Sequence, residues 1–205
     1  MQENDSARRQ IGPERLNAFS DGVLAIIITI MVLELKVPET PGVEALLAQW
    51  PLFSSYALSY LMVAIYWVNH HDLFNQVEQV TDGMVWCNLL LLFFLSLIPF
   101  TTGYMSVHHL EPLPTVIYAT SLLLPALAYL FLMKVIRSSG VTSQAHVGPA
   151  AHVKALVSLA FYAAAIPVAW VSPVTAILCI AAVGLMWLLP GRWTRRLERD
   201  SAKGG

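Results

Sequence analysis

The sequence has few charged residues. Only 12% of its 205 residues are Asp, Glu, Lys or Arg, whereas an ordinary soluble domain carries about 25%. The hydrophobic residue types make up 57% of the chain. This composition excludes a typical water-soluble globular domain and indicates a membrane protein, for which we expect no nucleic-acid partner.

Cysteine is scarce as well. The chain has two cysteines, Cys87 and Cys179, and both lie within apolar runs. Buried cysteine ordinarily behaves as a small hydrophobic residue, so a disulfide is not expected. We also find no soluble domain, low-complexity segment or long linker, and predict a single transmembrane domain over residues 1–205.

Long apolar runs are abundant. A helix needs about 20 apolar residues to cross a hydrocarbon layer of roughly 30 Å, and six runs approach or exceed that length. Proline after serine favours a turn, so Ser172 and Pro173 should join the last two runs as a helical hairpin. The prediction is an all-α polytopic membrane protein with helices at about 18–37, 47–69, 84–106, 113–134, 154–171 and 174–190.

The basic residues predict the orientation. Lys and Arg gather on the cytoplasmic side of membrane proteins, and six crossings put both termini on one side. Every Lys and Arg except Lys36 then falls on that side, in the N-terminal segment, the loop after the fourth helix and the C-terminal tail. We therefore expect a multi-pass protein of the cell membrane with cytoplasmic termini.

Polar residues gather where the first apolar run begins. The topology places the start of the first helix, with its Ser20 and Asp21, at the depth where the second helix ends and Asn88 enters the third. Ionisable groups in a membrane are costly unless paired or hydrated. Two interpretations remain open: a polar brace that locks the first three helices together, in which Arg15 or a histidine offsets the charge of Asp21, or a proton or ion site. The end of the second helix supplies Trp67, Asn69, His70 and His71.

An aliphatic stripe runs along the first helix. At about 100° per residue, Ile26, Ile30 and Leu33 share one narrow face, and Asp21 points about 140° away from Ile26. The side of the first helix that carries Ile26 and the side that carries Asp21 should therefore have different functions. Periodicity alone cannot distinguish a stripe that faces lipid or the protein core from a pore wall.

Three segments resemble a known family. The first helix starts with R-x-x-x-F-S-D, here Arg15, Phe19, Ser20 and Asp21. The second and third helices contain Y-W-V-N-H-H-D-L-F at 66–74 and N-L-L-L-L-F-F-L-S-L-I-P-F-T-T at 88–102. Together these segments resemble the transmembrane protein 175 family of potassium channels.

The resemblance implies a function and an assembly. It implies a potassium-selective channel formed by a homotetramer in the lipid bilayer, with a pore lined by the first helix. The narrowest ring would then be Ile26, followed by Ile30 and Leu33. A ring of isoleucines can dewet and block ions, whereas a slight widening admits potassium.

Two polar residues flank this stripe. Thr29 lies about 60° from the centre of the stripe, where its hydroxyl can help to replace water around an ion; back-bonding to a carbonyl four residues earlier is an equally good interpretation. Glu34, near the outer mouth, can raise the local cation concentration, or it can be merely a solvated residue at a helix end.

Other classes of protein fit less well. A secondary transporter or proton-coupled carrier would use a binding site at the midplane, where this chain has no charged residue. A metalloenzyme is disfavoured because the pairs His70–His71 and His108–His109 fall on opposite sides of the membrane. We therefore expect no enzymatic activity, no metal site and no cofactor, with potassium only as the permeant ion.

Overall fold

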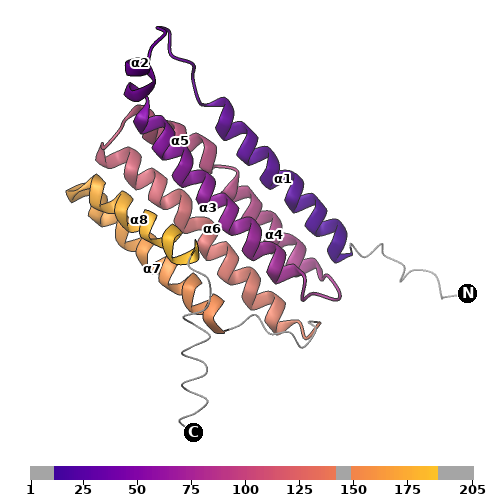
Figure 1. Ribbon diagram of the computed structural model, residues 1–205. Coiled ribbons are helices and arrows are strands. Elements are labelled where there is room, and N and C mark those ends of the chain that lie inside the picture. The colour runs from indigo at the N-terminus through magenta and orange to yellow at the C-terminus, as the bar shows by residue number, and fades with distance from the viewer. Residues whose placement is uncertain (1–11, 142–148, 189–205) are drawn as a thin grey trace, which may run out of the picture.

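The computed structural model describes residues 12–141 and 149–188, and within these ranges the regular elements are helices, with no β-strand (Figure 1). The all-α class predicted from the sequence is therefore confirmed. The helices are α1 Pro13–Leu33, α2 Val43–Ala48, α3 Trp50–Phe74, α4 Asp82–Leu95, α5 Ile98–Val107, α6 Pro112–Ser138, α7 Pro149–Val171 and α8 Pro173–Leu188.

The long helices lie side by side in one bundle, as Figure 1 shows. Helix α6 packs against α4, α5, α7 and α8. Helix α1 lies along one edge, where it packs against α3, α4 and α5, and α7 and α8 lie along the opposite edge. One side of α1 therefore faces the bundle, while no helix of the described part of the chain covers its other side.

Among the described residues, five segments are long and apolar enough to cross a membrane: Pro13–Leu33, Trp50–Phe74, Asp82–Val107, Pro112–Ser138 and Ala151–Val171. Helix α8 is apolar but has 16 residues, about 24 Å at 1.5 Å per residue. The last two residues of the predicted run 174–190 lie outside the described residues. A sixth crossing therefore stays a prediction.

The ends of four helices differ from the prediction by four or more residues. Helix α1 begins at Pro13 and ends at Leu33, whereas hydropathy predicted 18–37. Helix α3 continues to Phe74 rather than ending at residue 69. Helix α6 continues to Ser138 rather than ending at residue 134, and α7 begins at Pro149 rather than at residue 154. Polar residues extend α1 at its N-terminal end and α3 at its C-terminal end. The backbone hydrogen bonds of a helix can continue past the edge of an apolar run, and hydropathy alone does not predict this extension.

The third apolar run, predicted at 84–106, forms one candidate span over Asp82–Val107, but its helix is interrupted at Ser96 and Leu97. Helix α4 ends at Leu95 and α5 starts at Ile98, with Pro99 in the first turn of α5. Proline has no N–H, and its ring clashes with the carbonyl four residues earlier, here that of Leu95. Between the two helices the chain forms a tighter turn, in which the N–H of Leu97 donates to the carbonyl of Phe94, three residues earlier, at 3.2 Å.

The predicted helical hairpin at the C-terminal end is confirmed. Helix α7 ends at Val171, and Ser172 alone separates it from Pro173 at the start of α8. The hydroxyl of Ser172 accepts the backbone N–H of Thr175 at 3.3 Å, as a residue that caps a helix N-terminus does. Helices α7 and α8 therefore pack against each other as an antiparallel pair.

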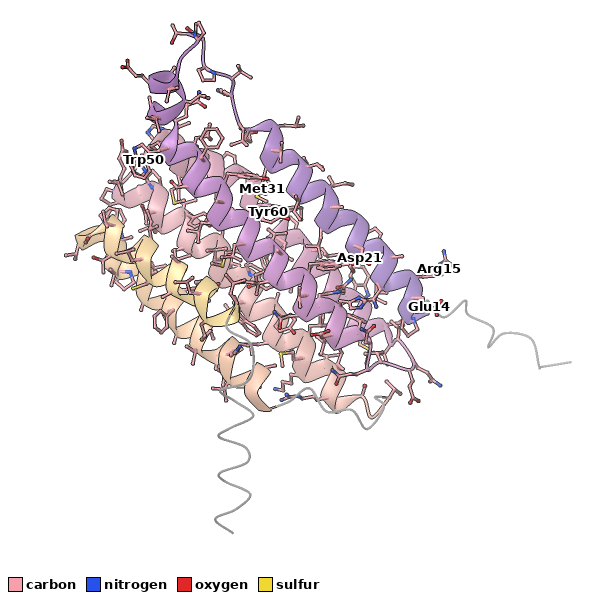
Figure 2. The ribbon with its side chains drawn as sticks, in the orientation of Figure 1. Glu14, Arg15, Asp21, Met31, Trp50 and Tyr60 are labelled. Atoms are coloured by element: carbon pink, nitrogen blue, oxygen red, sulfur yellow. The ribbon has the colours of Figure 1, made fainter. Side chains whose placement is uncertain are left out.

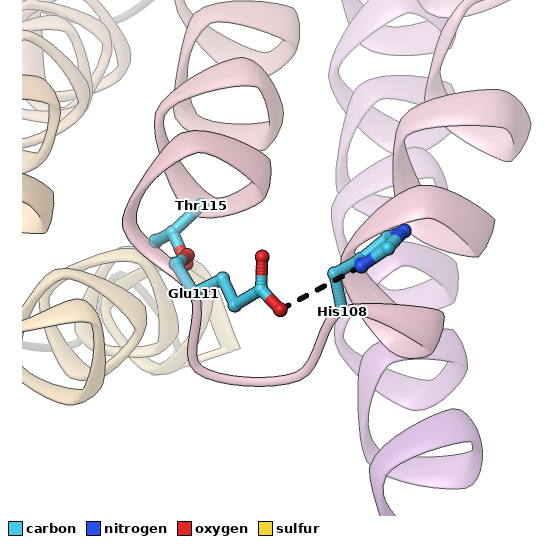
Figure 3. A network of polar contacts seen from close by, with 3 residues as sticks. All are labelled: His108, Glu111 and Thr115. Atoms are coloured by element: carbon cyan, nitrogen blue, oxygen red, sulfur yellow. Dashed lines mark hydrogen bonds and ion pairs between the residues drawn. The ribbon is translucent and has the colours of Figure 1, made fainter.

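A short loop joins α5 to α6 at the end of the bundle that holds α2. Nδ1 of His108 lies 3.7 Å from a carboxylate oxygen of Glu111, and the hydroxyl of Thr115 donates to the carbonyl of Glu111 at 2.8 Å (Figure 3). Leu110 between them adopts a positive φ of 61°. These local contacts help to fix where α6 begins.

Candidate functional site

Helix α1 has two chemically different faces. Its bundle-facing side is buried and contains Leu16, Ser20, Leu24, Ile27 and Met31. On the opposite side, the exposed fractions of Ile26, Ile30 and Leu33 are 58%, 43% and 80%. The aliphatic stripe found in the sequence therefore lies on the surface of the subunit and not in its core.

A buried chain of hydrogen bonds ties α1 to its neighbours. The amide nitrogen of Asn88 donates to the hydroxyl of Ser20 at 2.9 Å, and the amide oxygen of Asn88 lies 2.7 Å from Nε2 of His70. The hydroxyl of Ser20 donates in turn to the carbonyl of Leu16 at 2.9 Å. This chain joins α1, α4 and α3 through three side chains that are almost fully buried.

Asp21 is held by a tryptophan. The indole N–H of Trp67 donates to the carboxylate of Asp21 at 2.8 Å, which gives a second link between α1 and α3. The ring of His71 stacks on that of Trp67, with 6.2 Å between ring centroids. The hydrogen-bond partner of Asp21 among the described residues is therefore Trp67, and the expectation that Arg15 or a histidine offsets its charge stays a prediction.

The other residues predicted at this site are more dispersed. The Asn69 side chain donates to the carbonyl of Ile65 in its own helix at 2.7 Å, while its backbone carbonyl accepts the hydroxyl of Tyr129 at 3.1 Å. Phe19 is 52% exposed. Arg15 is exposed at the N-terminal end of α1, on the outside of the bundle (Figure 2), and its side chain forms no hydrogen bond or ion pair within residues 12–141 and 149–188.

Two polar residues lie near the other end of the stripe. The hydroxyl of Thr29 donates to the carbonyl of Ile26 at 2.9 Å, three residues earlier rather than four, and the residue is exposed. Glu34 is exposed after the last turn of α1. Its carboxylate lies beside Gly103 of α5 and, with Lys36 and His108, lines a cleft of about 380 Å³.

A second polar cluster lies deeper in the bundle and was not recognised in the sequence. The hydroxyl of Ser59 lies 2.7 Å from that of Thr102 and 2.8 Å from that of Tyr118, and the hydroxyls of Thr101 and Ser121 are 2.8 Å apart. These contacts join α3, α5 and α6. Single hydroxyl residues in apolar helices give no periodic signal, so only the fold brings them together.

The described residues contain no group of three or more His, Cys, Asp or Glu side chains that could hold a metal ion. His70 bonds to Asn88, whereas His109 packs edge-on against the ring of Trp50 at the other end of α3, with 4.6 Å between ring centroids. His146 lies outside the described residues. Cys87 and Cys179 are free thiols.

Long apolar helices, packed side by side and joined by buried polar side chains, define a polytopic α-helical membrane protein. A sequence profile described as endosomal/lysosomal potassium channel TMEM175 matches residues 15–99, the segment that contains most of α1, all of α3 and α4, and most of the hydrogen bonds above. The chain belongs to the TMEM175 family, which is a family of channels and not of enzymes.

Relatives and a solved structure agree with this assignment. Potassium channel HX13_20290 of Chryseobacterium sp. is 43% identical over 187 residues, which cover 91% of this chain and 96% of that protein. The crystal structure of a lysosomal potassium-selective channel TMEM175 homolog from Chamaesiphon minutus has a TM-score of 0.74 and 27% identity, and the match covers 88% of this chain and 98% of that one. The mouse endosomal/lysosomal proton channel TMEM175 is 33% identical over 114 residues, 50% of this chain but 23% of the mouse protein.

Proposed function

We propose that this protein is a potassium-selective cation channel whose pore is lined by α1. The observation that carries the proposal is the split of α1 into a buried, hydrogen-bonded face and an exposed aliphatic face with Ile26 near its centre. The names of the bacterial relatives and of the solved homolog support potassium as the permeant ion.

The pore requires several subunits, because one helix at the edge of a bundle cannot enclose a channel. We propose a homotetramer in which the exposed faces of four α1 helices surround one axis. The match to the mouse protein, which covers only part of its length, is consistent with a longer chain that contains more than one such unit.

The gate and the selectivity filter would then be the same structure. Rings of Ile26, Ile30 and Leu33 leave the narrow part of the pore without polar groups, so a small radius excludes water and ions. A slight widening admits potassium, for which the hydroxyl of the exposed residue Thr29 is a candidate ligand. Glu34 would raise the cation concentration at the mouth near Lys36.

The hydrogen bonds of Ser20, Asn88, His70, Asp21 and Trp67 would hold α1 at a fixed angle to α3 and α4. A rigid attachment is needed because a small change in the radius of an apolar constriction decides whether it is wet. In the membrane, six spans would place both termini in the cytoplasm, as the distribution of basic residues predicts.

Current through purified protein in a planar bilayer tests the function. With potassium on one side and sodium on the other, a potassium channel gives unitary current steps that reverse near the potassium equilibrium potential. Exchange without unitary steps would indicate a secondary transporter or proton-coupled carrier instead. A pH gradient across the bilayer, at equal potassium concentrations, separates proton current from potassium current.

A further inference from the structure

The four residues of the R-x-x-x-F-S-D motif point to opposite sides of α1. Ser20 is buried and bonds to Asn88, and Asp21 bonds to Trp67. Arg15 and Phe19 are exposed, and neither side chain has a polar partner within the described ranges. The motif therefore combines two residues that hold α1 to the bundle with two that have another role.

Helical geometry shows where the exposed pair lies. Arg15 is eleven residues before Ile26 and Phe19 is seven before it, and both spacings return to within about 20° of the same direction on an α-helix. Leu33, seven residues after Ile26, returns to within about 20° as well. Arg15 and Phe19 thus extend the stripe of Ile26 to the N-terminal end of α1.

We infer that Arg15 forms a ring of four guanidinium groups at the N-terminal mouth of the pore, and that Phe19 forms an aromatic ring between this mouth and Ile26. The inference rests on the proposed function, because it requires the exposed face of α1 to surround the pore. It assigns to two motif residues a role in conduction that bracing does not account for.

A cationic mouth has a measurable effect on the current. Four positive charges lower the local potassium concentration, so potassium that enters from this end crosses more slowly than potassium that enters from the end with Glu34. Salt screens the effect, because the Debye length falls from about 30 Å at about 0.01 M to about 3 Å at about 1 M. The pore should therefore conduct asymmetrically at low salt and nearly symmetrically at high salt.

Glu14 provides a matched control. It is exposed beside Arg15 at the same end of α1 (Figure 2), but it points about 120° away from Ile26. A substitution that removes its charge changes the surface potential at this end without changing the face that carries Arg15. Single-channel currents are measured at equal and opposite voltages in symmetrical KCl, for the wild type, Arg15→Gln and Glu14→Gln.

The expected result is specific to Arg15. In about 0.01 M KCl, Arg15→Gln should raise the smaller of the two currents about twofold or more, and in about 1 M KCl it should change little. Glu14→Gln should leave the ratio of the two currents near that of the wild type. Currents in Arg15→Gln equal to those of the wild type would overturn the inference. So would equal and opposite changes of the current ratio in Arg15→Gln and Glu14→Gln.

Phe19→Cys gives a second measurement that does not depend on the assembly of Arg15→Gln. A cationic methanethiosulfonate reagent added from the side of the termini should reduce the current of Phe19→Cys and leave the wild type, with its Cys87 and Cys179, unaffected. A current that persists after the new thiol is fully modified would remove Phe19 from the ion pathway. If Ile26→Asn alters conductance while Arg15→Gln and modified Phe19→Cys do not, only this inference fails; if Ile26→Asn also has no effect, the proposed pore itself fails.

Discussion

At the scale of single residues, Ile26 has the clearest expected effect on permeation. Its side chain is 58% exposed at the centre of the stripe, and the carbonyl of the same residue accepts the hydroxyl of Thr29. Ile26→Asn replaces four butyl groups with four amides, which should wet the constriction, raise the conductance and weaken discrimination against sodium. Reversal potentials under potassium–sodium gradients measure this change.

Val32 is the control for that experiment. It is an aliphatic residue of α1 with 44% exposure, similar to Ile30, but it lies about 120° away from Ile26 around the helix. Val32→Asn should therefore leave the reversal potential unchanged. An unchanged conductance and reversal potential in assembled Ile26→Asn would show that α1 does not line the narrow part of the pore.

Asn88 is the residue on which the attachment of α1 depends most. Asn88→Leu removes the partner of His70 and the amide that donates to Ser20, whose hydroxyl keeps its bond to the carbonyl of Leu16; a buried polar group left unpaired costs about 1–3 kcal/mol. The unfolding temperature in detergent should fall, with little change in the selectivity of channels that still assemble.

Asn69→Leu is the matched comparison for Asn88→Leu, because the side chain of Asn69 bonds only to a carbonyl of its own helix. Its unfolding temperature should stay closer to that of the wild type. If both variants unfold at the same temperature, the hydrogen bonds of Asn88 between helices add no more stability than a bond within one helix.

At the scale of elements, the sequence predicts the long helices and the Ser172–Pro173 hairpin because both leave local signals: apolar length and a proline after a serine. The break between Leu95 and Ile98 has a signal too, Pro99, but Pro125 and Pro167 have the same chemistry and lie inside α6 and α7. Which proline interrupts a helix depends on whether neighbouring helices satisfy the freed backbone groups, and this is a property of packing.

The candidate site follows the same division. The topology brings Ser20, Asn88 and His70 to one depth, and this is predictable from the order of the helices. That Arg15 and Asp21 point in different directions is also predictable from the sequence, since six residues turn a helix by about 240°. The shared motif nevertheless suggests that the two residues belong to one site. The cluster of Ser59, Thr102 and Tyr118 was not accessible, because it depends on the three-dimensional crossing of α3, α5 and α6.

The contact between α3 and α8 leads to a prediction about a single glycine. A Cβ atom at Gly184 would lie 2.8 Å from Cε of Met62 and 2.9 Å from Cδ2 of Leu61, so side chains must move or the helices must separate. Gly184→Ala should destabilise the protein by about 1–3 kcal/mol despite the higher helix propensity of alanine. Thermal unfolding in detergent measures this loss.

Gly83→Ala serves as the comparison. A Cβ atom at Gly83 would have its nearest contact, with Cγ1 of Val135, at 3.6 Å, which is ordinary van der Waals distance. Gly83→Ala should therefore leave the unfolding temperature unchanged or raise it slightly. Equal unfolding temperatures for wild type and Gly184→Ala would mean that Met62 and Leu61 adjust without cost and that the close approach of α3 and α8 is not a constraint.

At the scale of the whole molecule, the position of α1 at the edge of the bundle links the fold to assembly. Seven-residue spacings place Phe19, Ile26 and Leu33 on its outer face, while its inner face is fixed by hydrogen bonds to α3 and α4. Conduction through α1 therefore requires the exposed faces of several copies to meet.

We accordingly expect a tetramer. Native mass measurement in mild detergent should give four copies of the 22.6 kDa chain, and cross-linking of Leu33→Cys, whose side chain is 80% exposed, should give dimers because copies of this residue approach one another around the axis. Trp170→Cys, 60% exposed on α7 at the opposite edge of the bundle, is the control and should cross-link far less. A monomer that still gives unitary potassium currents would remove the shared pore, because a single chain would then have to conduct through its own interior.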